Sequence, residues 1–510
     1  MGIVPALLPE ESLIHMHAPA PQTEKPLSLE EIKGIIVGLI LAMLLAAIDQ
    51  TIVATAMPTM GREMGDVENL PWVVTAYLLA GTAVTPLYGK LSDIYGRRVM
   101  LQIGIATFVI GSIACGLSRS IVILSVARAL QGLGGGGLIS LAQTIIADIV
   151  APRERARYQV YIASVFITSS LVGPLLGGFF AEHLHWSLIF WINVPLGIGA
   201  WAMTSARLKR LPRHERPHQL DIPGAVLMVF ASCTLLLALS WGGLRYPWGS
   251  PQVLGLIGLS VLLWAGFGWR VSRAQEPLIP MSVLANPVVR AGTLSACFGM
   301  GAFIGLSIYI PIYMEAVYGL DPSHSGLALV PFMIGTVTGA TISGRILTFV
   351  KHYKRMPTAG LVLSVVSAAL VALSPVQLPL WALELAFVGM SMGLGTILPV
   401  CTIAIQNAVA MHELGTATGA ANFFRSLGGA LAVALFGAIV LGGSAVASSS
   451  GHGVSLESLL ASGADVTGLV RIFRTVFASA ALLLACALFF MAIMEERPLR
   501  SSAAPAPSHE

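Results

Sequence analysis

The feature that most constrains this chain is a series of apolar segments long enough to cross a lipid bilayer as α-helices. Such a helix needs about 20 predominantly apolar residues. The sequence therefore predicts an all-α polytopic membrane protein. Its fourteen predicted spans are 34–57, 71–89, 99–117, 121–143, 158–181, 186–206, 222–242, 252–270, 288–312, 326–349, 358–374, 378–408, 416–442 and 472–493.

The composition excludes other classes of protein. Charged residues make up 11% of the 510 residues and hydrophobic residues 55%, whereas a soluble domain carries about 25% charged residues. The apolar content is too high for a disordered chain. The five cysteines stand singly inside apolar runs, which indicates buried apolar side chains and neither disulfides nor metal ligands.

The loops predict an orientation in the membrane. Lys and Arg residues gather in alternate loops, and the loops between these contain only Arg62, Arg119 and Arg245. Because cytoplasmic loops retain positive charge, this asymmetry predicts a multi-pass protein with both termini in the cytoplasm. An even number of spans is required for that arrangement.

Glycines recur at one fixed separation in corresponding spans. The pairs are Gly89 and Gly344, Gly134 and Gly389, and Gly173 and Gly428. The repeat predicts two pseudo-symmetric six-helix bundles with two additional helices inserted between them, and a substrate site where the bundles meet. The predicted parts are an N-terminal cytoplasmic segment 1–33, a bundle 34–206, a linker with the inserted helices 207–285, a bundle 286–493 and a disordered cytoplasmic tail 494–510.

Four segments carry a resemblance to a known family. They are the loop Gly89-Lys90-Leu91-Ser92-Asp93-Ile94-Tyr95-Gly96-Arg97-Arg98, the fourth-span segment from Leu124 to Gly134 with Arg128, Gln131 and Gly132, the fifth-span segment Gly173-Pro174-Leu175-Leu176-Gly177-Gly178, and the first-span segment from Ile48 to Pro58. The loop, fourth-span and fifth-span segments resemble motifs of the major facilitator superfamily. The first-span segment resembles its fourteen-span drug:proton antiporters, which are multidrug efflux transporters.

Further segments fit the same subfamily, and two positions depart from it. The fitting segments are Trp186 to Pro195, Glu276-Pro277-Leu278, and Leu414 to Ala417 followed by Asn422, Arg425 and Gly428-Gly429. Ser169 stands where the fifth-span motif usually begins with glycine. The second copy of the loop, from Gly344 to Lys354, lacks the aspartate, which suggests that the cytoplasmic gate is asymmetric.

The resemblance implies a transporter and not an enzyme, energised by the proton gradient without a cofactor. The implied partners are small hydrophobic or cationic substrates and membrane lipids, a monomer is expected, and a periplasmic adaptor is left open. No nucleic acid is expected. The sequence contains no G-x-x-x-x-G-K-[ST] phosphate loop, so ATP-driven transport is not indicated.

Two charges inside the membrane predict a site for proton coupling. Asp49 lies about 12 Å from the outer end of its span and Arg128 about 10 Å from the outer end of its own, at 1.5 Å per residue. Intramembrane charges are costly and mark functional sites. We expect the two to interact while Asp49 is ionised, and protonation to release Arg128. The alternative is a permanent ion pair that only fixes helix packing.

The motif residues predict two gates. In the loop, the residues of a cytoplasmic latch are Gly89, Asp93, Gly96, Arg97 and Arg98. Asp93 is expected to bind a helix N-terminus or a basic side chain, and the arginines to bind partners or lipid phosphates. In the fifth span, Gly173, Pro174, Gly177 and Gly178 predict a kinked outer gate, because small residues allow close helix crossing and proline bends a helix. The alternatives are a basic loop that only sets topology and ordinary helix packing.

Polar residues elsewhere predict a substrate cavity. The candidates are Glu384, Asn422, Arg425, Gln143 and Tyr309, together with Tyr313 and Gln406. Glu384 is the acidic group that would suit a cationic drug, although a solvated residue at a helix end is the alternative. The favoured function is proton-coupled export of hydrophobic or amphipathic, cationic drugs across the inner membrane by alternating access. The alternatives are a dedicated exporter of one lipid, siderophore or metabolite, and a non-transporting scaffold or sensor.

Overall fold

The structure is a computed structural model that describes residues 29–66, 69–208, 220–243, 245–320, 322–347, 350, 352–374, 378–447 and 466–499. The described part is helical and contains no β-strand. Most of the predicted N-terminal segment, at 1–28, lies outside these residues, as do 209–219 of the predicted linker and 500–510 of the predicted tail.

The helices follow the order of the predicted spans. The first group comprises α1 (Leu29–Met64), α2 (Trp72–Tyr95), α3 (Arg97–Gly116), α4 (Ile121–Ile149), α5 (Pro152–His183), α6 (Leu188–Trp191) and α7 (Asn193–Arg207). The middle group comprises α8 (Ile222–Trp241), α9 (Pro251–Arg273) and α10 (Met281–Leu284). The last group comprises α11 (Pro287–Tyr318), α12 (Pro322–Leu327), α13 (Leu329–Leu347), α14 (Arg355–Leu373), α15 (Leu380–Ala408), α16 (Leu414–Ala447) and α18 (Val466–Ile493), with the short 3₁₀ helix Met411–Glu413 before α16.

In the described part, thirteen helical segments are long and apolar enough to cross a membrane. The remaining predicted span, 71–89, corresponds to α2, which has 24 residues and buries Lys90 and Ser92. It is long enough to cross but is not among the thirteen. The all-helical membrane fold is confirmed, and the count of fourteen spans stays a prediction.

Two predicted spans are interrupted in the structure. The predicted span 186–206 is divided between α6 and α7 by a turn at Ile192, and 326–349 is divided between α12 and α13 by a turn at Ala328. The first interruption matters for function, because it makes Asn193 the first residue of α7.

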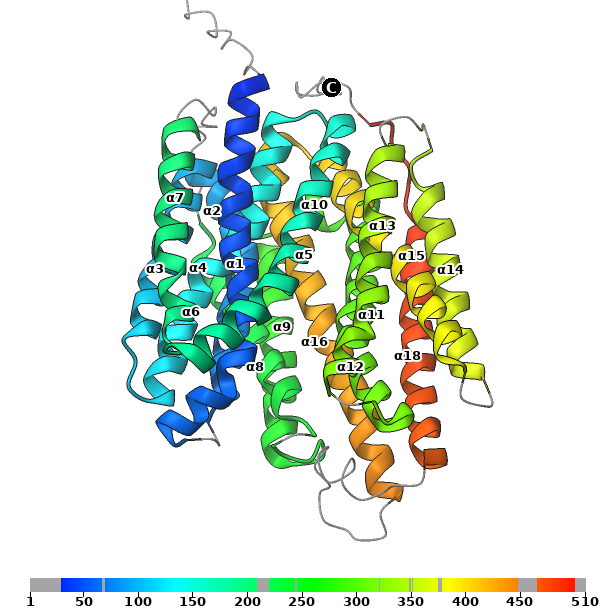
Figure 1. Cartoon of the computed structure of the whole chain (residues 1–510). Coiled ribbons are helices and arrows are strands. Elements are labelled where there is room, and N and C mark those ends of the chain that lie inside the picture. Colours follow the sequence, from blue (N-terminus) through cyan, green and yellow to red (C-terminus); the bar gives the residue numbers. More distant parts are fainter. Residues whose placement is uncertain are drawn as a thin grey trace, which may run out of the picture.

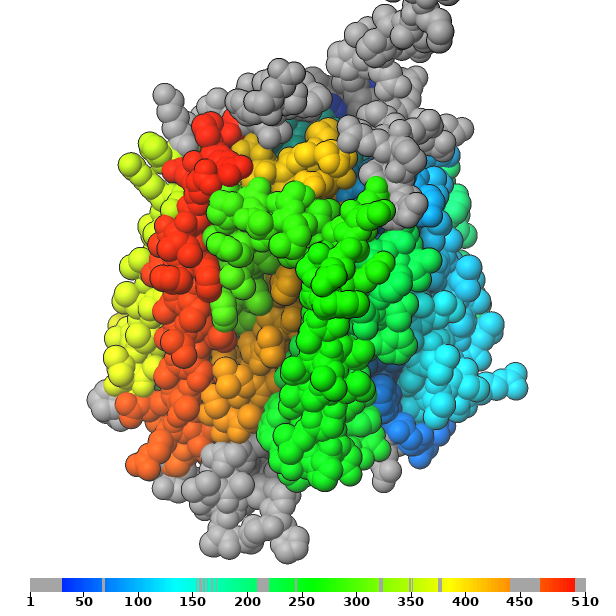
Figure 2. All heavy atoms as spheres, turned by 180° about the vertical axis from the view of Figure 1, so that it is seen from behind, coloured from blue at the N-terminus to red at the C-terminus, as the bar shows by residue number. Residues whose placement is uncertain are grey.

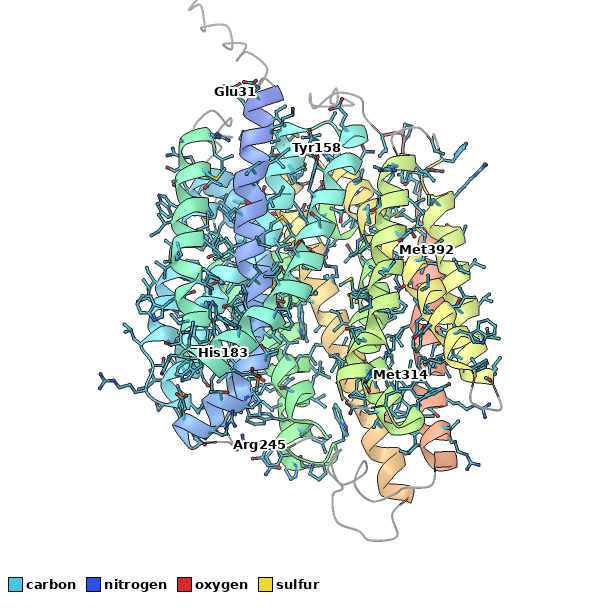
Figure 3. The ribbon with its side chains drawn as sticks, in the orientation of Figure 1. Glu31, Tyr158, His183, Arg245, Met314 and Met392 are labelled. Carbon is cyan, nitrogen blue, oxygen red and sulfur yellow. The ribbon has the colours of Figure 1, made fainter. Side chains whose placement is uncertain are left out.

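The helices stand side by side, and both described ends of the chain lie at the same end of the bundle (Figure 1). We call this end the terminal face. Figure 3 shows Glu31 of α1 and Tyr158 of α5 near the terminal face, and His183 of α5 and Arg245 toward the opposite face. Termini on one side are the arrangement that an even number of spans requires.

The first and last groups of helices pack in the same pattern. α2 packs on α4 as α13 packs on α15, and α1 packs on α5 as α11 packs on α16. In the same way, α7 contacts α1 and α3 as α18 contacts α11 and α14. This correspondence has the same order as the glycine repeat. We call the two groups the N-terminal bundle (α1 to α7) and the C-terminal bundle (α11 to α18).

The helices between the two bundles lie on one face of the molecule. In Figure 2, the green helices α8 and α9 separate the blue and cyan N-terminal bundle from the orange and red C-terminal bundle. α8 contacts α2 of one bundle and α16 of the other. Met228 of α8 and Phe267 of α9 share a buried apolar cluster with Ala417 and Ala420 of α16. The inserted helices therefore cover the line along which α2 and α16 meet.

Local signals fix several helix boundaries. The side chains of Ser120, Asp221 and Asn286 accept hydrogen bonds from the first free backbone N–H groups of α4, α8 and α11. Gly96 separates α2 from α3 with φ of 91°. A side chain rarely tolerates this conformation, so the glycine of the loop motif is explained by backbone geometry at the turn.

Candidate functional site

A buried ion pair joins α1 to α4 inside the N-terminal bundle. Arg128 Nη1 donates to Asp49 Oδ2 at 2.5 Å, and the exposed fractions of the two side chains are 1% and 0%. Arg128 Nε also donates to the backbone carbonyl of Val73 at 2.9 Å. The predicted contact between the two intramembrane charges is therefore present. Its role in proton coupling stays a prediction.

Amide side chains complete the shell around the carboxylate. Asp49 Oδ1 accepts from Gln131 Nε2 at 2.7 Å and from Asn193 Nδ2 at 3.0 Å. Gln131 Nε2 and Asn193 Nδ2 also approach Ser112 Oγ, at 2.8 and 3.4 Å. Gln131 Oε1 accepts from Arg128 at 2.6 Å. We call Asp49, Arg128, Gln131, Asn193 and Ser112 the carboxylate network; it connects α1, α3, α4 and α7.

The carboxylate network is arranged for an ionised Asp49. Removing an ion pair from water is costly, and the cost is offset only when the remaining lone pairs are also bonded. Both oxygens of Asp49 accept, and they face only donors. Tyr77 and Phe190 cover the guanidinium of Arg128, with ring centroids 4.2 and 5.8 Å from its central carbon. Protonation of Asp49 would replace one acceptor by a donor and force this shell to rearrange.

Sequence reasoning missed part of this network. It placed Gln131 and Asn193 inside motifs without assigning them a role, and it did not single out Ser112. A polar residue in an apolar span is a weak signal, because each of the three could have bonded to its own helix. Asn193 reaches Asp49 from the start of α7, and Asn193 Oδ1 has no hydrogen-bond partner among the described residues.

The loop motif contacts the start of α16 across the boundary between the bundles. Asp93 Oδ1 accepts from the backbone N–H of Gly415 at 3.0 Å, and Oδ2 accepts from that of Thr416 at 2.7 Å. The hydroxyl of Thr416 donates to Oδ2 at 2.6 Å. Asp93 thus caps a helix of the other bundle, where the partial positive charge of the helix end favours a carboxylate.

Arg97 and Gly89 support the contact that Asp93 makes. Arg97 pairs with Asp93 on one side and donates to Asp148 at 2.8 Å on the other, so it holds the carboxylate from within its own bundle. A Cβ atom on Gly89 would lie 2.4 Å from the carbonyl oxygen of Gly415, so only glycine allows this approach. Arg98 points elsewhere and donates to Ser205 at 3.4 Å. We call the Asp93–α16 contact the latch.

The fifth-span motif lies against α1 of its own bundle. A Cβ atom on Gly173 would lie 2.0 Å from Thr51 Oγ1, and one on Gly177 would lie 2.4 Å from the carbonyl oxygen of Ile52. The predicted close helix crossing is therefore found at these two glycines. Pro174 is exposed. A Cβ atom on Gly178 would have nothing within 4 Å, so this residue does not take part in the crossing.

A cavity of about 20 Å³ lies between the bundles. The predicted residues Gln143, Gln406, Asn422 and Arg425 all contribute to its lining. Asn422 Nδ2 donates to Gln143 Oε1 at 2.8 Å, and Gln406 Nε2 approaches the carbonyl oxygen of Gln143 at 3.4 Å. These bonds join α15 and α16 to α4 across the cavity. A volume of this size holds one water molecule, so the cavity has no room for a drug-sized substrate in this conformation.

Three other predicted residues do not line this cavity. Tyr309 packs against Phe436, and Tyr313 is buried among the aromatic rings of the C-terminal bundle. Glu384 lies on α15, fourteen residues before the cavity residue Leu398, which is about 21 Å along the helix axis. A role for Glu384 with a cationic substrate is therefore not supported by its position.

Comparison with known proteins identifies the family. The family model of the Major Facilitator Superfamily matches residues 39–433. The chain belongs to this superfamily. Its members are membrane transporters, so an enzyme is excluded and the multi-pass membrane fold follows.

Individual relatives agree with that assignment. The chain is 34% identical over 407 residues to the multidrug transporter protein MdtP of Bacillus subtilis, covering 80% of this chain and 75% of the relative. It is 35% identical over 406 residues to an uncharacterised MFS-type transporter of Mycobacterium tuberculosis, covering 79% of this chain but 59% of that longer protein. The solved structure of the proton:xylose symporter XylE matches with a TM-score of 0.60 at 14% identity, covering 92% of this chain and 98% of XylE. This last likeness concerns the fold alone.

Proposed function

We propose that this superfamily member exports hydrophobic or amphipathic compounds across the inner membrane in exchange for protons, by alternating access between its two bundles. The observation that carries the proposal is the buried carboxylate network, in which one titratable group, Asp49 of α1, bonds to α4 and α7 of the same bundle. The names of the multidrug relatives support the substrate class, and relatives named as efflux pumps support the direction of transport.

Asp49 is the proposed coupling group. While it is ionised, its two oxygens bind α4 and α7 through Arg128, Gln131 and Asn193. A proton on Asp49 neutralises the pair and puts an O–H among donors. Asn193 Oδ1, which lacks a partner among the described residues, can accept this O–H once the amide turns over. Coulomb coupling of several kcal/mol in such a site is enough to move a two-state equilibrium.

The latch is the proposed cytoplasmic gate. Lys90, Arg97 and Arg98 lie where α2 ends and α3 begins, and Arg355 lies at the start of α14. These helix ends belong to the terminal face, and excess positive charge favours the cytoplasmic side. In the described conformation Asp93 is bonded to α16 of the other bundle, which supports a closed gate on that side. In the proposed cycle, a proton enters Asp49 from outside and the latch opens. The proton leaves to the cytoplasm as substrate enters, and the latch closes again behind the substrate.

A dedicated exporter of one metabolite and a non-transporting scaffold remain the rival functions. An intact carboxylate network speaks against the scaffold, since a buried charge without a function is costly to keep. No observation on the described residues supports a periplasmic adaptor. Transport of several dyes that differ in shape, each abolished by a protonophore, would favour the multidrug exporter over a dedicated one.

The coupling proposal is tested with purified protein in proteoliposomes. The measurement is proton movement driven by a substrate gradient, in wild type and in Asp49→Asn. We expect the variant to lose substrate-driven proton movement while it still binds substrate. The matched control is Asp221→Asn, because Asp221 is also a buried aspartate bonded to an arginine, Arg270 at 2.9 Å, but lies on the inserted helices.

The outcome that contradicts the proposal is proton exchange by Asp49→Asn at the wild-type rate. A loss of coupling in both variants would equally contradict it, because it would show a general effect of removing buried charge. Thermal unfolding of each variant in detergent separates lost coupling from lost folding.

A further inference from the structure

The cavity between the bundles contains a positive charge that no described residue neutralises. Arg425 is the one charged side chain among the described residues that line it. It makes no ion pair or hydrogen bond with any described residue. The other lining residues are neutral, and none carries a carboxylate.

The position of Arg425 makes this unpaired charge costly. Arg425 lies eleven residues after the start of α16, about 16 Å along the helix and thus well inside the membrane. Arginine at this depth pairs with another group or faces a pathway for polar substrates. Arg128, inside the membrane in the N-terminal bundle, pairs with Asp49. Arg425 has no such partner among the described residues, which fits an arginine that faces a pathway for polar substrates.

The neighbours of Arg425 add hydrogen-bond donors. Asn422 lies one turn before it on the same face of α16, and Gln406 faces it from α15. In the described conformation both amides donate to Gln143 of the other bundle. Separation of the bundles breaks these two bonds, and the C-terminal bundle then presents two amide N–H groups and a guanidinium to one space. The oxygens of Gln143 occupy the places that acceptor atoms of a ligand would take.

The remaining lining is mostly apolar and suits a hydrophobic body. It consists of Ala296, Leu398, Cys401, Ile405 and Ala421, together with the two threonines Thr402 and Thr418. We propose that this cavity, when opened, is a binding site for amphipathic organic anions, whose carboxylate or sulfonate binds Arg425, Asn422 and Gln406. The proposal rests on the exporter function above, and it replaces the cationic substrate that the sequence led us to expect from Glu384.

The test compares three probes that share one fluorescent apolar body and differ in charge: dansylglycine (anionic), dansylamide (neutral) and dansylcadaverine (cationic). Equilibrium binding to the purified full chain is measured by fluorescence titration in detergent, without a proton gradient. We expect wild type to bind dansylglycine more tightly than either of the other two. Charge-assisted hydrogen bonds to a carboxylate predict that Arg425→Gln weakens dansylglycine binding by about tenfold to a hundredfold.

Three further variants make the result specific. Arg425→Lys keeps the charge and should retain most of the preference for dansylglycine. Arg290→Gln is the matched control, because Arg290 is an exposed arginine of α11 in the same bundle and does not line the cavity; it should bind all three probes as wild type does. If Arg425→Gln does not fold, as judged by thermal unfolding, Asn422→Leu gives the readout and should weaken dansylglycine binding selectively.

Three outcomes would overturn the proposal. They are the absence of saturable dansylglycine binding to wild type, tighter binding of dansylcadaverine, and an equal loss for all three probes in Arg425→Gln, which would indicate a structural role. Because binding is measured without a gradient, failure of proton-coupled export leaves this result unaffected. If wild type shows no preference for the anionic probe, the proposal of proton-coupled export is in turn unaffected.

Discussion

The latch offers the sharpest quantitative test, through Asp93→Asn. The native carboxylate accepts three hydrogen bonds from α16: the N–H groups of Gly415 and Thr416 and the hydroxyl of Thr416. Asparagine has one oxygen and one NH₂ group at the same places. Whichever way the amide is turned, its NH₂ meets a backbone N–H of α16, so at least one bond between the bundles is lost.

The magnitude follows from the bonds that are lost. One charge-assisted hydrogen bond contributes about 1.5–3 kcal/mol, and removing the negative charge from a helix N-terminus costs a further 0.3–1 kcal/mol, roughly. A total of about 3 kcal/mol changes the ratio of closed to open latch by about 150-fold. A protein that is roughly 100:1 closed would become slightly more than half open.

The assay is the distribution of distances between spin labels at Lys33 of α1 and Arg355 of α14, two exposed positions on opposite bundles at the terminal face. Asp93→Asn should populate a longer distance that is rare in wild type. The control is Asp148→Asn: Asp148 bonds the same Arg97 at 2.8 Å, but both residues belong to the N-terminal bundle. Unchanged distances in Asp93→Asn, or the same change in Asp148→Asn, would refute the assignment of the latch.

Two more predictions concern packing and the carboxylate network. Gly177→Ala should lower the thermal unfolding temperature in detergent relative to Gly178→Ala by an amount corresponding to about 1–3 kcal/mol. The reason is that the new methyl group meets the backbone of α1 in the first variant and nothing within 4 Å in the second; equal temperatures would contradict the helix crossing. Asn193→Leu removes a donor 3.0 Å from Asp49 and should cost about 1.5–3 kcal/mol of stability, measured in the same way; unchanged stability would mean that water replaces the amide.

The parts of the site that could be predicted from the sequence are those fixed by the cost of charge in a membrane. Asp49 and Arg128 lie at similar predicted depths in spans of one bundle. Because an unpaired charge is costly inside the membrane, two opposite charges at one depth are expected to form an ion pair, and the structure contains this pair. Uncharged groups give no such constraint. The hydroxyl of Ser112 could have formed hydrogen bonds only within its own helix, where it donates to the carbonyl of Phe108. Its position beside Gln131 therefore depends on tertiary packing.

The sequence predicted the kinds of group that Asp93 binds, but not the helix that it caps. A carboxylate in a tight basic loop suggested either a helix N-terminus or a basic side chain, and Asp93 in fact contacts both. Which helix it caps depends on how the two bundles dock, and α16 begins more than 300 residues later in the chain. The motif glycines show a second limit of prediction from the sequence. Gly177 and Gly178 are adjacent, but successive residues of a helix point about 100° apart, so only Gly177 faces α1.

Arg128 and Arg425, both inside the membrane, suggest that the proposed exporter uses one arginine for proton coupling and another for substrate binding. A group that couples to protons must be neutralised in one state and released in another, which is what a carboxylate beside Arg128 provides. A group that binds an anionic substrate must instead stay free of a protein carboxylate, because an internal partner would compete with the ligand at far higher effective concentration. Arg425 meets this second condition among the described residues. Opening the bundles breaks the bonds of Gln143 to Asn422 and Gln406, so binding of an anion and opening would stabilise each other.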